Sequence, residues 1–96
     1  MSRQRLILTA ASQPTLARHV KLRFDDTRQR WVVLAPERLM TPSETAVEVL
    51  KLADGQRTVD AIAAALAAEF DAPHDAIVAD ILPLLQDMAD HGYLTA

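Results

Sequence analysis

Residues 30–55 read RWVVLAPERLMTPSETAVEVLKLADG, and within this stretch the pattern changes from that of a strand to that of a helix. Residues 31–34 (WVVL) form an apolar run rich in β-branched side chains, which is typical of a buried strand. Pro36 ends this strand because proline has no amide hydrogen to donate to a sheet. Residues 38–40 (RLM) can then pair again as a short strand, which we expect at the edge of the sheet.

The same stretch predicts where the first helix begins and ends. We expect Thr41 as its N-cap, Pro42 at its first helical position and Glu44 as the partner of Thr41 in a capping box. We expect Asp54 and Gly55 to end the helix, with the glycine in a left-handed conformation. The apolar residues between these ends recur at helical spacing: Ala46, Val47, Val49, Leu50, Leu52 and Ala53.

The sequence before this stretch predicts one more strand. Val20, Leu22 and Phe24 alternate with polar residues, which is the period of a half-buried strand. Residues 26–29 (DTRQ) are polar and lack glycine, so they predict a hairpin loop of about four or five residues. We therefore expect a small three-stranded antiparallel sheet whose last strand is short and exposed.

The sequence after Gly55 predicts two more helices. Thr58 is expected to cap the second helix, which ends near residues 69–71. The third helix begins near Pro73 and runs to about His91. The second helix has its apolar face formed by Val59, Ile62, Ala63, Leu66 and Phe70, and the third by Ile77, Val78, Ile81, Leu82, Leu84, Leu85, Met88 and Ala89. The expected fold is α+β: a three-stranded antiparallel sheet followed by a three-helix bundle.

One glycine and one proline affect the expected shape of this third helix. Gly92 is its expected C-cap. Pro83 lies inside the helix, removes one amide donor and predicts a bend. We favour a bend that wraps the helix around the core, and a bend that shapes a groove against the edge strand is the alternative.

The N-terminal residues 1–14 show no stable period and are expected to form a flexible arm ahead of a single domain at residues 15–96. Leu6, Ile7 and Leu8 are its one apolar patch. The arm is either a frayed tail or a segment that becomes ordered on a partner or on a second subunit. A homodimer formed through this arm is therefore one hypothesis.

Composition and charge limit the possible functions. The 96 residues include no cysteine, which excludes disulfides, thiolate metal ligands and a thiol nucleophile and fits a cytoplasmic protein. No apolar run approaches the roughly 20 residues that span a bilayer. Residues 1–57 contain all ten Lys and Arg and six Asp and Glu, a net charge of +4, whereas residues 58–96 contain seven Asp and Glu and no Lys or Arg, a net charge of −7. We expect the two halves to attract each other within one domain, or between subunits.

Catalysis, metal binding and DNA binding are disfavoured by the residues present. His19, His74 and His91 are far apart in sequence and form no zinc-protease pattern, and the two glycines, Gly55 and Gly92, cannot form a phosphate loop. A winged helix that binds DNA needs Lys and Arg on its reading helix. The third helix has four aspartates and neither Lys nor Arg, so DNA would repel it; the basic sheet keeps a nucleic-acid-binding regulator open as the alternative function.

The remaining candidate for a binding site is the open edge of the sheet, to which an extended peptide can add as a further strand. The candidate edge is formed by residues 38–41, and the apolar face of the third helix could form the opposite wall of a groove, with Arg38 and Asp80 on the rim. The candidate peptide-binding residues are Arg38, Leu39, Met40, Thr41, Ile77, Asp80, Ile81, Leu84 and Leu85.

The order of several short motifs resembles the PqqD family, the small peptide chaperones of pyrroloquinoline quinone biosynthesis. The resemblance extends from about His19 to Leu94. Pro42 and Ser43 depart from the family pattern before the first helix. The matching residues are Arg23 and Asp25, the run Leu34-Ala35-Pro36-Glu37, Thr45-Ala46, Val49-Leu50, Leu52-Ala53-Asp54-Gly55 and His91-Gly92-Tyr93-Leu94.

This resemblance implies a function that the residues alone leave open. It implies a winged-helix-like domain that binds the leader of the ribosomal precursor peptide PqqA. It also implies that the domain presents this peptide to the radical S-adenosylmethionine enzyme PqqE. On this interpretation the chain is not an enzyme and carries no cofactor, because the iron–sulfur chemistry belongs to PqqE.

Overall fold

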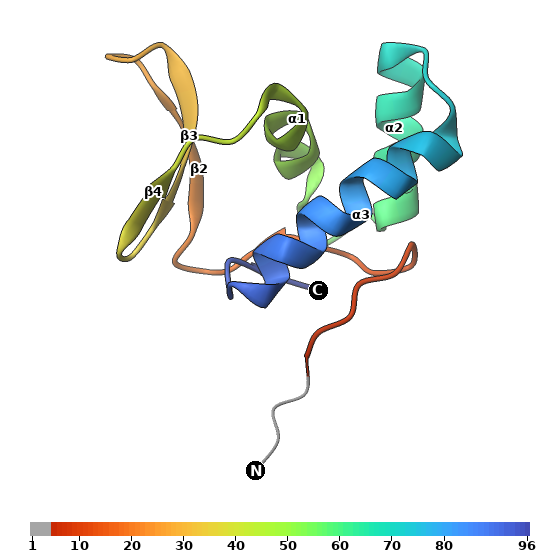
Figure 1. Ribbon diagram of the computed structural model, residues 1–96, viewed down its shortest axis with the longest axis horizontal. Coiled ribbons are helices and arrows are strands. Elements are labelled where there is room, and N and C mark those ends of the chain that lie inside the picture. Colours follow the sequence, from red (N-terminus) through yellow and green to blue (C-terminus); the bar gives the residue numbers. More distant parts are fainter. Residues whose placement is uncertain (1–4) are drawn as a thin grey trace.

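The computed structural model describes residues 5–96, which form two small antiparallel sheets and three helices (Figure 1). This confirms the expected α+β composition. In chain order the elements are β1 (Thr15–Leu16), β2 (Lys21–Asp25), β3 (Arg30–Ala35), β4 (Arg38–Met40), α1 (Glu44–Leu52), α2 (Val59–Phe70), α3 (His74–Asp90) and β5 (Leu94–Thr95).

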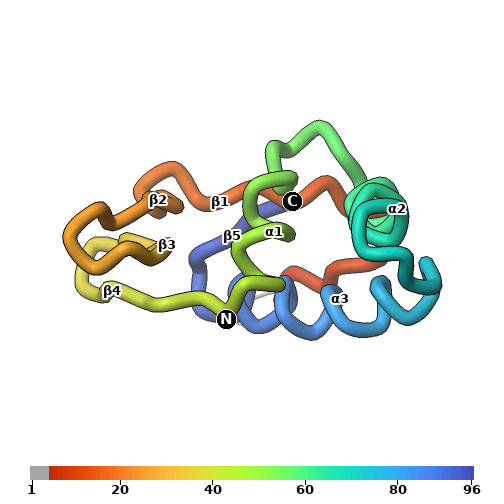
Figure 2. The backbone as a smooth tube through the Cα atoms, turned by 90° about the horizontal axis from the view of Figure 1, so that it is seen from above, coloured from red at the N-terminus to blue at the C-terminus, as the bar shows by residue number. Residues whose placement is uncertain are grey.

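The larger sheet has the strand order β2–β3–β4, and both of its connections are antiparallel hairpins. Residues 26–29 form the first hairpin loop, as expected, because Asp25 pairs with Arg30. Residues 36 and 37 form the second loop, because Ala35 pairs with Arg38. The three helices all lie on one side of this sheet, and α1 lies next to it (Figure 2).

Helix α1 begins two residues later than the sequence predicts. Its N-cap is Ser43, whose Oγ accepts a hydrogen bond from the amide of Ala46 at 3.2 Å. The expectation that Thr41 caps the helix, with Pro42 at the first helical position and Glu44 closing a capping box, is therefore wrong. The physical reason is distance: the chain uses residues 41–43 to cross from β4 to the helix layer before it can begin to coil (Figure 1).

Helix α1 also ends earlier than expected: it stops at Leu52 with Ala53 as its C-cap, so Gly55 has the expected left-handed φ of 79° but does not cap the helix. The ends of α2 and α3 follow the sequence closely. Thr58 caps α2, with its Oγ1 accepting from the amide of Ala61 at 3.0 Å. At the end of α3, the amides of Gly92 and Tyr93 donate to the carbonyls of Ala89 and Met88, the hydrogen-bond pattern of a Schellman motif. This pattern requires a left-handed residue, and Gly92 supplies it with φ of 78°.

Pro83 is tolerated in the middle of α3 because of where it points. The helix continues through it from His74 to Asp90. Pro83 is exposed, and so is Ala79, whose carbonyl would have accepted the missing amide. That carbonyl is therefore on the side of the helix where water can satisfy it.

The N-terminal segment differs from the expected flexible arm. Residues 1–4 of the predicted arm lie outside the described residues, but residues 5–14 pack against the helices. Leu8 is 6% exposed and belongs to the core. The amides of Val59 and Asp60, which begin α2, donate to the carbonyls of Ser12 and Ala10 at 2.8 and 2.9 Å. Since the first amides of a helix have no partner inside it, this segment satisfies donors that the helix cannot.

The second sheet connects the two ends of the domain and was not expected from the sequence. Strand β1 pairs with β5, and Thr15 also forms a bridge with Asp54. The amide of Gly55, which has φ of 79°, donates to the carbonyl of Pro14 at 3.0 Å. Each strand has only two residues, too short for periodicity to reveal it.

One hydrophobic core connects the N-terminal segment, the sheet and all three helices. Its buried residues are Leu8, Ala17, Val20, Val33, Val49, Leu50, Ala53, Val59, Ile62, Ala63, Leu66, Ile81, Leu85 and Leu94. Within residues 5–96, none of the helices has the length and apolar character needed to cross a membrane.

Candidate functional site

Strand β4 is one of the two edge strands of the larger sheet, and β2 is the other. On one side β4 pairs with β3, and no other strand within residues 5–96 pairs with its opposite side. In a hairpin with a two-residue loop, the flanking pair Ala35 and Arg38 is hydrogen-bonded and the next pair, Leu34 and Leu39, is not. The amide and carbonyl of Leu39 therefore point away from β3, toward the open edge.

A cavity of about 720 Å³ opens where β4 ends. Thr41 and Pro42, which follow β4, line it. Phe24 and Trp31 line it from the sheet, and Phe70 lines it from the end of α2. These are three of the four aromatic residues of the chain, so this cavity collects most of its aromatic surface. The remaining lining residues are Gln29, Arg30, Glu44, Thr45, Val47 and Glu48.

A second cavity of about 240 Å³ lies between the three helices. Ile77, Asp80 and Ile81 of α3 line it. It shares three lining residues with the first cavity, so the two adjoin along the first half of α1. We call the two cavities together the α1 groove. The shared residues are Thr45, Glu48 and Phe70.

Trp31, on the sheet side of the cavity, contacts two neighbouring side chains. Its ring meets that of Phe24 edge to face, with centroids 5.6 Å apart and an angle of 71° between the rings. Lys51 Nζ lies 4.7 Å from the Trp31 ring centroid and 3.4 Å from Glu48 Oε1. Lys51 of α1, which also pairs with Glu48, thus connects α1 to the sheet through a cation–π contact with Trp31.

The structure distributes the predicted site residues over three environments. Arg38, Leu39 and Met40 lie on the open edge and line neither cavity; Leu39 is 50% exposed. Thr41, Ile77, Asp80 and Ile81 line the α1 groove, although Ile81 is only 1% exposed and belongs mainly to the core. Leu84 is half-buried against the core.

Leu85 needs correction as a site residue. Its side chain is fully buried in the core, so it offers no surface to a ligand. The helical period places it on the same face as Ile81, but that face packs against the remaining helices at its centre and is accessible only toward its N-terminal end. Leu85 instead packs in the core beneath the residues of α3 that line the groove.

The aromatic residues of the groove were not selected from the sequence. Phe24 and Phe70 were expected on core-facing surfaces, yet they are 43% and 56% exposed. Both lie near the end of their element, where the sheet and α2 extend beyond the neighbours that would cover them. The scarcity of aromatic residues in the chain is the signal that could have drawn attention to them.

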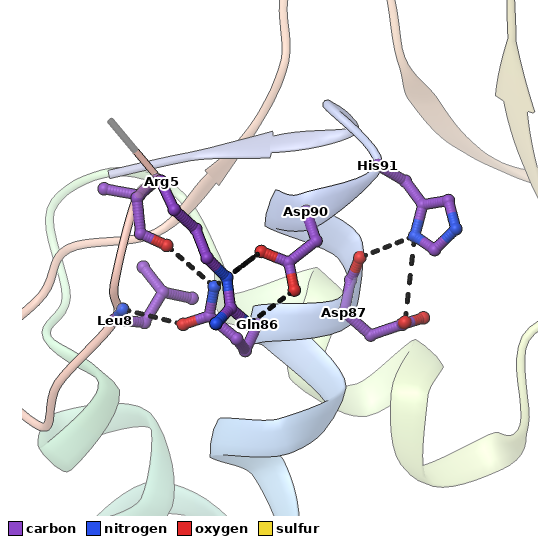
Figure 3. Close-up of polar contacts among 7 residues, drawn as sticks. Arg5, Leu8, Gln86, Asp87, Asp90 and His91 are labelled. Atoms are coloured by element: carbon purple, nitrogen blue, oxygen red, sulfur yellow. Dashed lines mark hydrogen bonds and ion pairs between the residues drawn. The ribbon is translucent and has the colours of Figure 1, made fainter. Parts of the chain in front are cut away.

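The shortest ion pair among residues 5–96 lies at the C-terminal end of α3 (Figure 3). Arg5 Nε and Nη2 donate to the two carboxylate oxygens of Asp90 at 2.8 and 2.7 Å. Gln86 Nε2 donates to Asp90 at 3.0 Å and to the carbonyl of Leu6 at 2.7 Å, and its Oε1 accepts from the amide of Leu8 at 2.9 Å. The hydrogen bond from Arg5, followed by that from Gln86, lowers the pKa of Asp90 to about 2.

A second titratable contact connects α2 to the start of α3. His74 Nε2 lies 3.0 Å from Asp60 Oδ1, and His74 Nδ1 lies 3.4 Å from Asp75 Oδ1. The hydrogen bond to the Asp60 backbone, then that to the Asp75 side chain, raises the pKa of His74 above 6.5. Across residues 5–96, the structure gathers no group of three or more His, Asp or Glu side chains suited to hold a metal ion.

Comparison with known proteins gives one consistent family. The family model described as "Coenzyme PQQ synthesis protein D (PqqD)" matches residues 30–94. A Rhodopseudomonas palustris protein named PqqA binding protein is 50% identical over 95 residues, which cover 99% of this chain and 93% of that protein. A protein of the same name from Bradyrhizobium diazoefficiens is 51% identical over 88 residues, which cover 92% of this chain and 85% of that protein.

A solved structure agrees with these sequence matches. It is the solution NMR structure of the PqqD part of PqqCD from Methylobacterium extorquens, which is described as a functional and stand-alone recognition element for ribosomally synthesized and post-translationally modified peptides. The two chains are 44% identical, the TM-score is 0.81, and the match covers 93% of this chain and 95% of that chain.

Proposed function

This chain belongs to the PqqD family, and from that premise we propose that it is an adaptor of pyrroloquinoline quinone biosynthesis that binds the precursor peptide PqqA. Support comes from relatives that are named PqqA binding proteins and from the structural match to a peptide recognition element. The adaptor carries PqqA to the radical S-adenosylmethionine enzyme PqqE, and the chemistry takes place on PqqE. The sheet and three helices act as a winged-helix-like platform for the peptide.

The observation that carries this proposal is the unpaired edge of β4. PqqA adds to this edge as a further strand, with the outward amide and carbonyl of Leu39 as the central hydrogen-bonding groups. Figure 2 shows β4 and α3 on the same side of the molecule, with residues 41–43 and α1 between them. A peptide on β4 therefore lies on the face to which α3 contributes Ile77, Asp80 and Ile81.

The test separates the backbone of Leu39 from its side chain. Leu39→Pro removes the outward amide but no hydrogen bond to β3, so the sheet can retain its pairing. Leu39→Ala removes the same apolar side chain and keeps the amide. We expect Leu39→Ala to bind PqqA within about fivefold of the original chain, and Leu39→Pro to bind at least about tenfold more weakly, which is the scale of one lost hydrogen bond left without a partner. Binding is measured by calorimetry with the PqqA peptide encoded in the same genome.

A second measurement does not depend on either variant folding. Hydrogen exchange at the Leu39 amide is expected to be fast in the free chain and to slow when PqqA is added. Exchange that stays fast at saturating peptide, with shifts elsewhere, would reject strand addition at β4. A peptide that shifts no amide of the chain at all would reject PqqA binding itself.

A further inference from the structure

The α1 groove exposes aromatic side chains on two opposing sides. Phe24 is 43% exposed on the sheet side, and Phe70 is 56% exposed on the helix side. Trp31 lies beside Phe24 as its cross-strand partner and also lines the groove, with contacts to Phe24 and Lys51. An aromatic side chain left partly in water gains free energy when another apolar group covers it, so this pair of walls is suited to a large apolar side chain.

The charges around the groove are mainly negative. Glu44, Glu48 and Asp80 line it, against one guanidinium, that of Arg30. Glu48 is paired with Lys51 at 3.4 Å. Glu44 and Asp80 form no ion pair with any residue in the described range 5–96. A cation brought into the groove would therefore meet two carboxylates that have no cationic partner.

The groove is also continuous with the open edge of the sheet. Thr41 and Pro42 follow Met40 directly and line the groove. An extended peptide advances about 3.3 Å per residue, so a strand on β4 that continues past Met40 reaches the groove within about two or three residues. One extended peptide is long enough to occupy both.

We propose that the α1 groove selects a segment of the precursor peptide that places a large apolar side chain between Phe24 and Phe70 and a neighbouring lysine or arginine near Glu44 and Asp80. This inference rests on the proposed function, because it takes PqqA as the occupant. It specifies which peptide side chains the groove recognises, in addition to the backbone hydrogen bonds at β4.

A second copy of the chain is the competing occupant. Its Leu6 and Ile7 are 40% and 59% exposed and are preceded by the cationic Arg5, so they have similar chemistry. However, Arg5 already donates two hydrogen bonds to Asp90 of its own chain. The precursor peptide needs no such bond to be broken, and we therefore favour it.

The chain provides its own reporter for the test. Trp31 is its single tryptophan, so an isotope-labelled sample gives one indole N–H signal, and an unlabelled peptide adds none. We expect this signal to shift when PqqA is added. Phe70→Ser is expected to weaken binding about tenfold and Phe70→Leu by less, because leucine keeps an apolar wall.

The charge component has a matched control on the same helix. Asp80→Asn removes a carboxylate of the groove and is expected to weaken PqqA binding about threefold at low salt, with less effect at high salt. Asp87→Asn removes an exposed carboxylate of α3 that lies outside the groove, and is expected to leave binding unchanged. Equal losses for the two variants would overturn the charge component.

Peptide variants identify the side chain that the groove binds. Each apolar residue of PqqA is replaced in turn by serine and tested against the original chain and Phe70→Ser. We expect one position at which the two losses are not additive, because both substitutions remove the same contact. Additive losses at every position would mean that no peptide side chain contacts Phe70.

The outcomes distinguish this inference from the function on which it rests. If PqqA shifts the amides of residues 38–41 but leaves the Trp31 indole and the Phe70→Ser affinity unchanged, the groove inference fails and strand addition stands. If PqqA shifts nothing, the proposed function fails. If the indole signal shifts with protein concentration in the absence of peptide, a second copy occupies the groove and the inference is overturned.

Discussion

Asp90 shows how one side chain fixes a segment that has no regular secondary structure. Its two carboxylate oxygens accept from Nε and Nη2 along one edge of the Arg5 guanidinium, and Gln86 adds a third hydrogen bond. Gln86 in turn bonds the backbone of Leu6 and Leu8 (Figure 3). The pair is exposed, so it positions the segment more than it stabilises the fold, and the buried side chain of Leu8 does the latter.

Arg5→Ala gives a prediction at this residue scale. Asp90 has a pKa of about 2 in the folded chain, against 3.8 ordinarily. Because the folded pKa is depressed, the stabilising contribution is present above pH 3.8 and is lost as the pH falls from 3.8 through about 2. In Arg5→Ala we expect the pKa of Asp90 to rise toward 3.8, with Gln86 retaining part of the shift.

This prediction is checked by titrating the Asp90 carboxyl carbon in NMR spectra of both chains. Asp54 is an internal control, since hydrogen bonds from the amides of Gln56 and Arg57 lower its pKa independently of Arg5. An Asp90 pKa that stays at about 2 in Arg5→Ala would show that Arg5 does not contact it in solution. A pKa of Asp54 that moves as well would indicate a general change of the fold.

At the scale of elements, the position at which α1 begins determines which residues after β4 line the groove. The chain leaves β4, crosses in residues 41–43 and begins to coil at Glu44. Thr41 and Pro42 line the groove instead of belonging to the helix. The delay in the helix start therefore creates part of the site.

The cap of α1 can be tested by two single substitutions. Ser43→Ala removes the oxygen that accepts from the amide of Ala46 and is expected to lower the free energy of unfolding by about 1 kcal/mol. Thr41→Ala, the matched control, is expected to change it by less than about 0.5 kcal/mol, because Thr41 is exposed and caps nothing. Urea unfolding of the three chains measures both. A larger loss for Thr41→Ala than for Ser43→Ala would restore Thr41 as the cap.

The elements that the sequence predicts well are those with local causes. The hairpin loops, the Thr58 cap, the end of α3 at Gly92 and the edge position of β4 all follow from turn chemistry or from a short run of residues. The pairing of β1 with β5 and the packing of Leu8 could not be predicted, because they depend on partners about 80 residues away along the chain.

The candidate site divides in the same way. Leu39 at an open edge follows from Pro36 and the short strand after it, and Ile77 and Asp80 follow from the helical period of α3. The exposure of Phe24 and Phe70 does not, since periodicity gives the face of a residue but not where the neighbouring element stops covering it. Helix α1 has only nine residues, and it does not cover Phe24 and Phe70, which line the cavity next to its first turns.

At the scale of the whole molecule, charge separates the two functions that a small sheet with three helices could serve. The sheet carries Lys21, Arg23 and Arg30, whereas α3 carries four aspartates, Asp75, Asp80, Asp87 and Asp90, and no Lys or Arg. A DNA-binding domain of this type places its reading helix against phosphates, and these carboxylates would be brought toward them. The proposed peptide binding has no such conflict, since the carboxylates of the α1 groove would favour a basic segment.

We therefore expect duplex DNA to leave the amide spectrum unchanged at about 0.15 M salt, where phosphate contacts still support non-specific binding of basic domains. PqqA is expected to shift it under the same conditions. A residual attraction of DNA for the sheet would appear only at lower salt, would be centred on Lys21, Arg23 and Arg30, and would decrease steeply as salt is added. The quadruple substitution of the four α3 aspartates by asparagine provides the sharpest control, because it removes the repulsion and leaves the β4 edge intact. Gain of DNA binding by that variant alone would confirm that charge on α3 excludes DNA. DNA binding by the original chain at 0.15 M salt, with shifts on α3, would instead favour a nucleic-acid regulator over a peptide adaptor.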